Sequence, residues 1–344
     1  MCMKKLVKII SLFIALLVAF SVYGCQINLP NENGDVTSSQ GATCTVTLVY
    51  NNGLDNKIMT EEMGEPFPMP SDPKKENYIF TGWYDSNKCV KKYDFSKDLS
   101  ADITLYAGYE LDAITLTNSI STNQIKGTFK IINKSYSTNF FGQETKSSVG
   151  QGSAFCFYKD SNNNFYLLTN CHVAKKNVDY DKQKLTVVDY KGNTYDASIY
   201  KSPEKTLSAI DPSYDLACLV FNATEIDYPV FPFATQNALA TEDVIALGTP
   251  QGQTNAITYG KAEKYQKVNI SETLKDYSNI TFDVLTHNAF ITNGSSGGVL
   301  LNSKLQVIGV NYAGKEDNDT SQYICSFAIP LDKVTEFLDT YVYS

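Results

Sequence analysis

The sequence predicts an all-β protein, in which a small β module precedes a larger β-barrel or β-sandwich domain and a short helix follows. Short apolar segments recur between residues 128 and 330, separated by Asn, Asp and Gly turns, as in antiparallel β proteins. Only one segment has clear helical periodicity: it begins at Pro330, and its apolar residues, spaced for one face, are Leu331, Val334, Phe337 and Leu338. The 344 residues exceed what one core usually fills, so more than one domain is expected.

Residues 1–24 have the pattern of an export signal. Three lysines precede an apolar stretch at 9–20 that is too short for an ordinary transmembrane helix. A small residue followed by Cys25 resembles the lipobox of bacterial lipoproteins, whose cysteine is acylated, and implies a lipid anchor on the outer side of the cytoplasmic membrane. The alternative is a plain secretory signal cut nearby. Residues 25–42, rich in Asn, Gly, Ser and Thr, are expected to be a flexible spacer.

Charge and cysteine content exclude some classes of function. The formal net charge is −8, and removal of residues 1–24 takes away three lysines and no acid, which leaves about −11. So acidic a chain is a poor candidate for nucleic-acid binding. No CxxC or CxxH spacing suggests a metal, and no cofactor is expected. Three cysteines lie inside apolar strand patterns, so buried thiols are favoured over disulfides, which remain open: Cys156, Cys218 and Cys325.

Residues 43–111 are predicted to form a compact β unit. Strands are expected at 44–50, 78–84 and 103–107, around Trp83, the only tryptophan. The Asn-Gly turn, the prolines, Gly-Trp-Tyr and Leu-Tyr-Ala fall in the order and separation of the internalin-type (Listeria–Bacteroides) repeat, which this unit resembles over about 65 residues. The resemblance implies a β-grasp-like spacer or adhesion module. An unrelated small β domain is the alternative.

Residues 112–127 are rich in Thr, Ser and Asn and are expected to be a linker, and residues 128–344 form the larger domain. Its expected strands are 152–158, 165–170, 185–190, 194–200, 215–221, 243–248, 280–286, 298–301, 305–312 and 322–329.

Residues 293–298, Asn-Gly-Ser-Ser-Gly-Gly, are the candidate site of a serine nucleophile. Glycines permit the tight, positive-φ backbone that lets neighbouring N–H groups face one oxyanion. Ser296 is assigned as the nucleophile because glycines follow it, with the N–H groups of Gly294 and Ser296 as the oxyanion hole. Ser295 is the second candidate nucleophile. Taken alone, the segment would be only a flexible turn.

A serine hydroxyl needs an imidazole base, and the base needs a carboxylate to fix its tautomer. His172 follows an apolar strand and is chosen over His287, which lies nine residues before Ser296 and is interpreted as structural or pocket-lining. Asp215 is chosen over Asp211 because it abuts an apolar strand that would bury it. The order His, Asp, Ser is one in which such triads assemble.

With these residues in place, 150–340 resemble the trypsin-like serine peptidases, and more closely their HtrA-like branch. The matching segments are Gly-Ser-Ala-Phe at 152–155, Asp-Leu-Ala at 215–217, Leu-Gly-Thr-Pro-Gln-Gly at 247–252, Ile-Gly-Val-Asn at 308–311 and Ser-Phe-Ala-Ile-Pro at 326–330. The resemblance implies two six-stranded barrels with the triad in the cleft between them. Asn293 stands where the family has proline, and Asn288 where it has an acid. No PDZ domain is expected to follow.

By the same resemblance, Phe290 lies at the base of the substrate pocket and Asn311 lines it. Neither is charged, so cleavage after Lys or Arg is not expected, and small or medium apolar residues are favoured. The leading hypothesis is an exported serine endopeptidase that acts on proteins, with a surface ligand as a second partner, bound by the repeat. The rival is a non-catalytic binding or adhesion protein built on a peptidase fold.

Overall fold

The computed structural model describes residues 41–89, 91–249, 256–269, 275–316 and 322–343. The predicted signal segment, Cys25 and the spacer up to residue 40 lie outside these residues, as does 250–252 of the Leu-Gly-Thr-Pro-Gln-Gly segment. The chain divides into two compact units, with the boundary between Thr115 and Leu116. Among the described residues, no helix combines the length and apolar character needed to cross a bilayer.

The first unit is a four-stranded sheet with a parallel central pair. Its order is β2-β1-β4-β3, with β1 parallel to β4 and the other neighbours antiparallel. The strands are β1 (Thr43–Val49), β2 (Lys57–Glu62), β3 (Tyr78–Tyr84) and β4 (Ile103–Leu111). The three predicted strands are present, and the buried core includes Trp83. The sequence did not indicate β2, because Met59 is its only apolar side chain that packs against the core and no apolar alternation results.

Residues 112–127 contain a helix rather than an irregular linker. α2 (Ala113–Thr122) is followed by a 3₁₀ helix, η1 (Gln124–Gly127). The Asp112 carboxylate accepts hydrogen bonds from the backbone N–H groups of Ile114 and Thr115, which caps the first turn. Ile120 and Ile125 are buried. Burial of Ile120 and Ile125 and capping by Asp112 therefore stabilise helical structure in a segment whose composition does not favour it.

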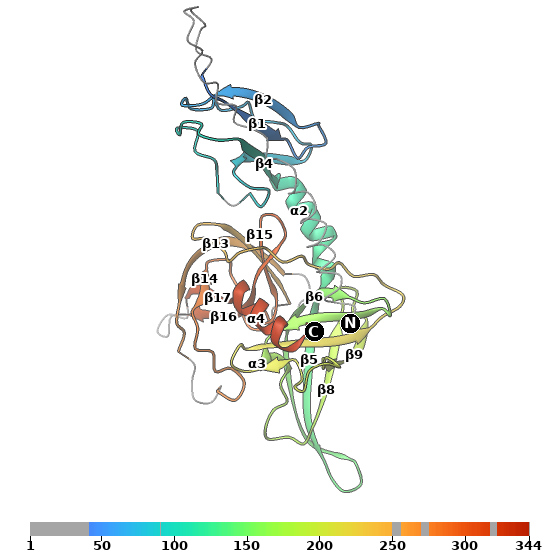
Figure 1. Ribbon diagram of the computed structural model, residues 1–344. Helices are drawn as coiled ribbons and strands as arrows, with labels where there is room; N and C mark the ends of the chain where they lie inside the picture. Colours follow the sequence, from blue (N-terminus) through green and yellow to red (C-terminus); the bar gives the residue numbers. More distant parts are fainter. Residues whose placement is uncertain (1–40, 90, 250–255, 270–274, 317–321, 344) are drawn as a thin grey trace, which may run out of the picture. The chain divides into compact units, whose positions relative to one another are not determined.

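The second unit contains a closed barrel of six antiparallel strands, in the order β11-β7-β6-β5-β8-β9 and closed by pairing of β9 with β11. Its strands β5, β6, β8 and β9 are labelled in Figure 1. A short β10 (Ile210–Asp211) pairs with β11. The barrel strands are β5 (Thr128–Thr138), β6 (Glu144–Lys159), β7 (Asn164–Thr169), β8 (Lys182–Val188), β9 (Thr194–Ile199) and β11 (Leu216–Asn222). Its core is apolar and rich in aromatic rings, among them Phe129, Phe165, Phe221 and Tyr228.

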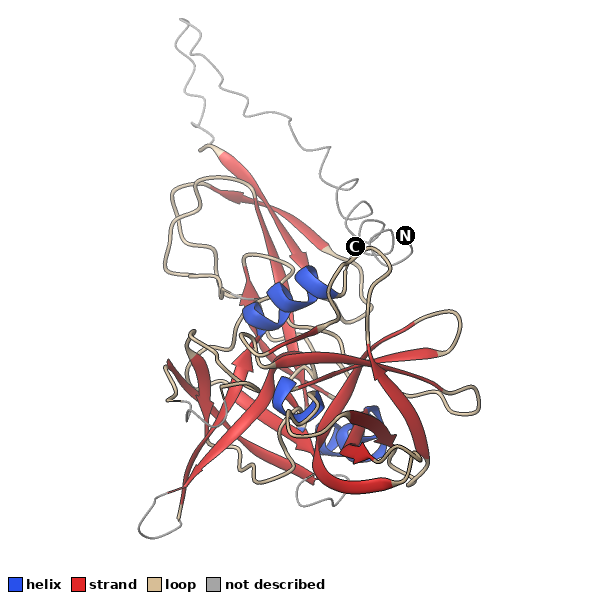
Figure 2. Cartoon of the chain, turned by 90° about the horizontal axis from the view of Figure 1, so that it is seen from below, coloured by secondary structure: helices blue, strands red, loops and turns tan. Residues whose placement is uncertain are grey.

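A second closed barrel follows, in the order β12-β13-β14-β17-β16-β15. Its strands are β12 (Asp243–Gly248), β13 (Ala256–Gln266), β14 (Val284–His287), β15 (Val299–Asn302), β16 (Val307–Glu316) and β17 (Tyr323–Pro330). The terminal helix α4 (Leu331–Tyr341) buries the four predicted apolar residues. The expected all-β class and the double six-stranded barrel are confirmed, and strands dominate the cartoon in Figure 2.

Two barrel strands were missed from the sequence. The buried face of β5 is partly polar, with Asn133, Ser135 and Ser137 pointing inward. Only Ala262 of β13 is buried, and several of its side chains are Lys or Glu. Neither strand carries the apolar signal on which strand prediction depends.

The described cysteines are all free thiols. Cys156, Cys218 and Cys325 are buried, as expected for cysteines that act as small hydrophobes. Burial raises the pKa of Cys156 to about 12, so this thiol stays protonated and unreactive at neutral pH.

Candidate active site

The first barrel brings His172 and Asp215 together through strand pairing. β7 ends at Thr169 and leads through Asn170 into the short helix α3 (Cys171–Ala174), which carries His172. Asp215 immediately precedes β11, which is antiparallel to β7 with Ala217 opposite Thr169. Because the end of one strand lies beside the start of the other, the imidazole and the carboxylate meet at the barrel edge.

Two hydrogen bonds join these residues. Asp215 Oδ2 lies 2.7 Å from His172 Nδ1, and Asp215 Oδ1 accepts the His172 backbone N–H at 2.9 Å. The Asp215 side chain is fully buried, whereas that of His172 is 28% exposed. Asp215 has a positive φ of 49°, and its carbonyl accepts a hydrogen bond from the Asn170 side chain at 3.0 Å. The pairing leaves Nε2 as the imidazole nitrogen that faces other partners.

The second barrel presents Ser296 on two consecutive β-turns. Ser295 N–H donates to the Thr292 carbonyl and Gly298 N–H donates to the Ser295 carbonyl, each at 2.9 Å. The third residue of each turn is a glycine with positive φ, 94° at Gly294 and 84° at Gly297. This is the pattern of a type II turn, which requires positive φ at that position. The glycines identified in the sequence are thus explained by turn geometry.

These turns leave the amides of Asn293, Gly294 and Ser296 without a backbone acceptor in the described residues. Gly297 N–H donates to the Asn311 carbonyl at 2.8 Å, so Ser295, Gly297 and Gly298 all use their N–H groups. Within the described part of the chain, the N–H groups of Gly294 and Ser296 have no backbone acceptor. The sequence predicted these two groups as the oxyanion donors, and both are free to take that role.

Ser153 of β6 ties the turns of the second barrel to the first. Its N–H donates to the Ser296 carbonyl at 2.8 Å, and its Oγ donates to the Gly294 carbonyl at 2.7 Å. Gly297 packs so closely that a Cβ there would lie 2.1 Å from the Ser153 carbonyl oxygen. Ser153 was assigned no role from the sequence, although a polar residue inside an apolar strand indicates that its side chain needs a buried hydrogen-bond partner.

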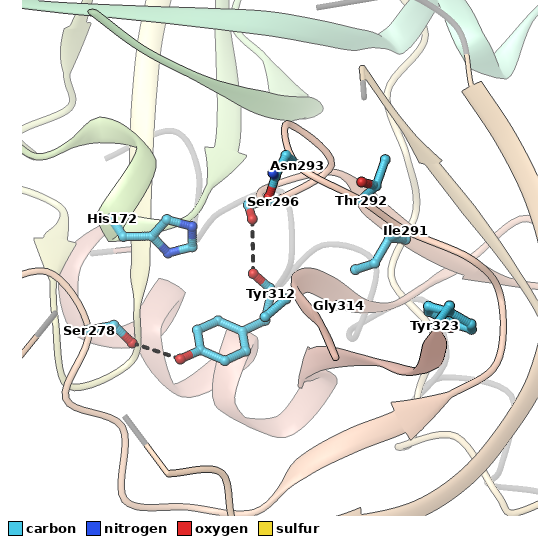
Figure 3. Close-up of a pocket in the computed structure, with 10 residues that line it drawn as sticks. His172, Ser278, Ile291, Thr292, Asn293, Ser296, Tyr312, Gly314 and Tyr323 are labelled. Carbon is cyan, nitrogen blue, oxygen red and sulfur yellow. Dashed lines mark hydrogen bonds between the residues drawn. The ribbon is translucent and has the colours of Figure 1, made fainter. Parts of the chain in front are cut away.

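Ser296 and His172 share a cleft, but the serine hydroxyl has a different partner. Ser296 Oγ donates to the backbone carbonyl of Tyr312 at 2.9 Å (Figure 3). The Tyr312 ring packs edge-on against the His172 ring, with centroids 6.0 Å apart, and its hydroxyl lies 3.3 Å from Ser278 Oγ. Burial raises the pKa of Tyr312, so the phenol stays protonated. Tyr312 was not identified from the sequence.

The cleft has a volume of about 420 Å³ and contains both His172 and Ser296. Its remaining lining is uncharged: Ser278, Ile291, Thr292, Asn293, Tyr312, Ala313, Gly314 and Tyr323. Phe290 and Asn311, expected to line the substrate pocket, line an adjacent cavity of about 150 Å³, which shares Ile291 and Thr292 with the cleft. Asn311 is fully buried and Phe290 is 48% exposed. Chain position alone did not predict which cavity these side chains line.

The alternative residues lie elsewhere. His287 is fully buried in β14, where desolvation lowers its pKa to about 4. Asp211 bonds to the Tyr341 hydroxyl and the Ser213 N–H rather than to His172. Asn288 is exposed and accepts the Lys261 N–H. In the described ranges, no group of three or more His, Cys, Asp or Glu side chains is arranged to hold a metal ion.

Comparisons with known proteins agree with this geometry. Residues 152–310 match the model of the trypsin-like peptidase domain, and residues 45–108 match that of the Listeria-Bacteroides repeat domain.

Individual relatives are serine proteases. The chain is 33% identical over 200 residues to serine protease HTR4 of Rattus norvegicus, which covers 58% of this chain and 35% of that protein. It is 31% identical over 200 residues to serine protease HTRA1 of Xenopus tropicalis, covering 58% and 37%. It is 32% identical over 190 residues to the serine protease Do-like HtrB of Bacillus subtilis, covering 54% and 37%.

The chain thus spans little more than a third of the length of these curated relatives. The chain contains a trypsin-like peptidase domain homologous to the HtrA-family serine proteases, preceded in the sequence by a Listeria–Bacteroides repeat domain.

Proposed function

We propose that this protein is a serine endopeptidase that hydrolyses peptide bonds of proteins, with Ser296, His172 and Asp215 as its catalytic triad. The observation that carries the proposal is the pair of hydrogen bonds from buried Asp215 to the ring and backbone of His172, in the cleft that also contains Ser296. No cofactor takes part.

The arrangement supports acyl transfer by ordinary steps. The Ser296 hydroxyl turns from the Tyr312 carbonyl toward His172, whose Nε2 takes its proton as Oγ attacks the scissile carbonyl. Asp215 holds the ring tautomer and stabilises the imidazolium. The N–H groups of Gly294 and Ser296 stabilise the oxyanion, and loss of one such donor costs about 3–4 kcal/mol. His172 then protonates the leaving amine, and water hydrolyses the acyl-enzyme.

Cleavage of unfolded casein by the full chain tests this function. Ser296→Ala is expected to abolish cleavage, whereas Ser295→Ala, its neighbour and the second candidate nucleophile, retains it to within tenfold. Cleavage that persists in Ser296→Ala and disappears in Ser295→Ala would show that Ser295 is the nucleophile and that the assignment to Ser296 is wrong. If the intact chain cleaves neither casein nor an activated ester, the proposed activity fails.

We further propose that the mature protein is exported and tethered to the bacterial cell envelope by a lipid on Cys25. Support comes from the three lysines, the short apolar stretch and the small residue before Cys25. Cells fed a radiolabelled fatty acid should label the wild-type chain and not Cys25→Ser, which should leave the membrane fraction. A soluble, unlabelled wild-type chain would favour the plain secretory signal.

The repeat domain is proposed as a spacer or as a module that binds a surface ligand. One observation also keeps a non-catalytic binding function in view: the Ser296 hydroxyl is bonded to Tyr312 and not to His172. A chain that fails to cleave casein and still retains cells or cell-wall fragments through residues 43–111 would favour that second function.

A further inference from the structure

A second cavity borders His172 on the side away from Ser296. It has a volume of about 280 Å³, and His172 is the residue that it shares with the 420 Å³ cleft. Its other lining residues are Asn133, Ser135, Ser148, Gly150, Gln151, Val173, Lys175, Asn177 and Tyr277. We call it the polar cavity.

The position of the polar cavity follows from the proposed chemistry. The acyl half of a substrate lies at Ser296 and the two free amides, whereas His172 protonates the leaving amine. The chain that leaves must therefore pass His172 on its far side. The polar cavity lies on that side and does not include Ser296, so it is placed to receive side chains that follow the scissile bond.

The chemistry of the lining selects a class of side chain. Many of the lining side chains carry a hydroxyl or an amide, alongside Gly150, His172 and Val173. Lys175 contributes the only Lys, Asp or Glu side chain of the lining. The Lys175 ammonium donates to the backbone carbonyl of Asp276 and lies 5.7 Å from the centre of the Tyr277 ring. Within the described residues it forms no ion pair with a carboxylate. A half-buried cation without a carboxylate partner favours an anionic ligand.

We propose that the polar cavity is a leaving-group-side subsite that prefers substrates with Glu or Asp shortly after the scissile bond, through Lys175. This inference rests on the proposed peptidase activity. It concerns a different part of the substrate from the uncharged cleft, which receives the residue before the bond.

Acyl transfer to added amines tests the subsite separately from catalysis. The full chain would be given a p-nitrophenyl ester of blocked alanine, together with Ala-Glu-amide, Ala-Gln-amide or Ala-Lys-amide. The dipeptide amine attacks the carbonyl of the acyl-enzyme, an amide bond forms, and the Ser296 hydroxyl is released with its proton. Because this step is the reverse of acylation by a peptide, the ratio of dipeptide product to hydrolysis product reports binding on the leaving-group side.

For the wild type, the ratio of dipeptide product to hydrolysis product should be highest with the Glu dipeptide, lower with Gln and lowest with Lys. Each step should be roughly two- to fivefold, the range for partly exposed ion pairs. The preference should shrink as ionic strength rises. Lys175→Gln, which keeps a donor for the Asp276 carbonyl, should abolish the preference, and Lys175→Glu should reverse it. Lys176→Glu is the matched control, because Lys176 bonds to the Tyr180 carbonyl and does not line the polar cavity; it should keep the wild-type order.

The two possible failures are distinguishable. If the ester is not hydrolysed, the proposed peptidase activity fails. If the ester is hydrolysed and the three dipeptides partition equally, or if Lys176→Glu changes the order as much as Lys175→Glu, the subsite proposal is overturned. If Lys175→Gln keeps the wild-type preference for the Glu dipeptide, the subsite proposal is likewise overturned.

Discussion

The two barrels of the peptidase domain contribute to the cleft in different ways. The first supplies His172 and Asp215 already joined by two hydrogen bonds, with the carboxylate fully buried. The second supplies Ser296 on two glycine turns, and its hydroxyl is bonded to Tyr312 of the same barrel. The proposed base is therefore fixed within one barrel, whereas the proposed nucleophile has a competing partner in the other.

This difference indicates where the activity would be controlled. The hydrogen bonds that join His172 to Asp215 lie within the first barrel, whereas the second barrel contributes the Tyr312 ring against the imidazole. The proposed triad is therefore completed by a turn of the Ser296 hydroxyl away from Tyr312 and toward His172. The turns that carry Ser296 are held by Ser153 of the first barrel and by close packing at Gly297.

The largest effect is expected from Asp215→Asn, which breaks the fixed half. Asparagine favours the wrong imidazole tautomer, so kcat should fall by roughly 10⁴-fold, measured with a peptide or ester substrate. Asp211→Asn is the control, because Asp211 bonds to Tyr341 instead of His172. A loss at Asp211 as large as that at Asp215 would contradict the assignment.

The next effect is expected from Gly297→Ala. A Cβ would lie 2.1 Å from the Ser153 carbonyl oxygen, so strain and overpacking together should destabilise the domain by about 3 kcal/mol. Gly192→Ala has almost the same φ, 86°, but its Cβ meets nothing within 4 Å, and should cost only about 1 kcal/mol. Urea unfolding measures both. Equal losses would show that the close approach at Gly297 is unimportant.

A third test compares the barrels by acid sensitivity. The pKa of buried His287 in the second barrel is about 4 in the folded state, below the usual value of about 6.5. As the pH falls, His287 is protonated in the unfolded chain before it is protonated in the folded chain. The contribution of His287 to stability is therefore complete above about pH 6.5 and is lost as the pH falls toward 4. From pH 7 to pH 5, the free energy of unfolding of the wild type should fall by about 2 kcal/mol more than that of His287→Leu.

The first barrel should behave differently over that range. Hydrogen bonds from its own side chains and backbone lower the pKa values of Asp160 and Asp189, although burial opposes this. Their stabilising contribution is therefore lost only at more acidic pH. Urea unfolding from pH 7 to pH 5 that is the same in wild type and in His287→Leu would exclude His287 as the source of acid sensitivity.

The smallest effect is expected from Asn293→Pro. Asn293 occupies the second position of the first turn, where proline is favoured, and its N–H donates no hydrogen bond in the described residues. Proline should stabilise the domain by about 0.4–1 kcal/mol and leave the turn intact. A lower melting temperature would show that the turn is not of the proposed type.

The sequence was most informative where function depends on residue type and order. Histidine, aspartate and the glycine-flanked serine were identified because each follows or precedes an apolar strand or a glycine turn. It was least informative where a role depends on side-chain direction or on the backbone. Phe290 and Asn311 line a different cavity from the one expected, and Tyr312 bonds to Ser296 through a backbone carbonyl that any residue possesses.

Strand prediction failed for a related reason. β5 has polar residues on its buried face, and only Ala262 of β13 is buried, so neither has the apolar alternation that marks a half-buried strand. Their positions are set by pairing with neighbours that do carry the signal.

The most direct test of the central claim is to map the residue that a fluorophosphonate labels in the full chain. We expect one phosphonyl adduct per chain, located on Ser296 by peptide mass spectrometry, absent in Ser296→Ala and formed far more slowly in His172→Ala. Labelling of another residue, or of Ser296 at a rate that does not depend on His172, would contradict the proposed triad.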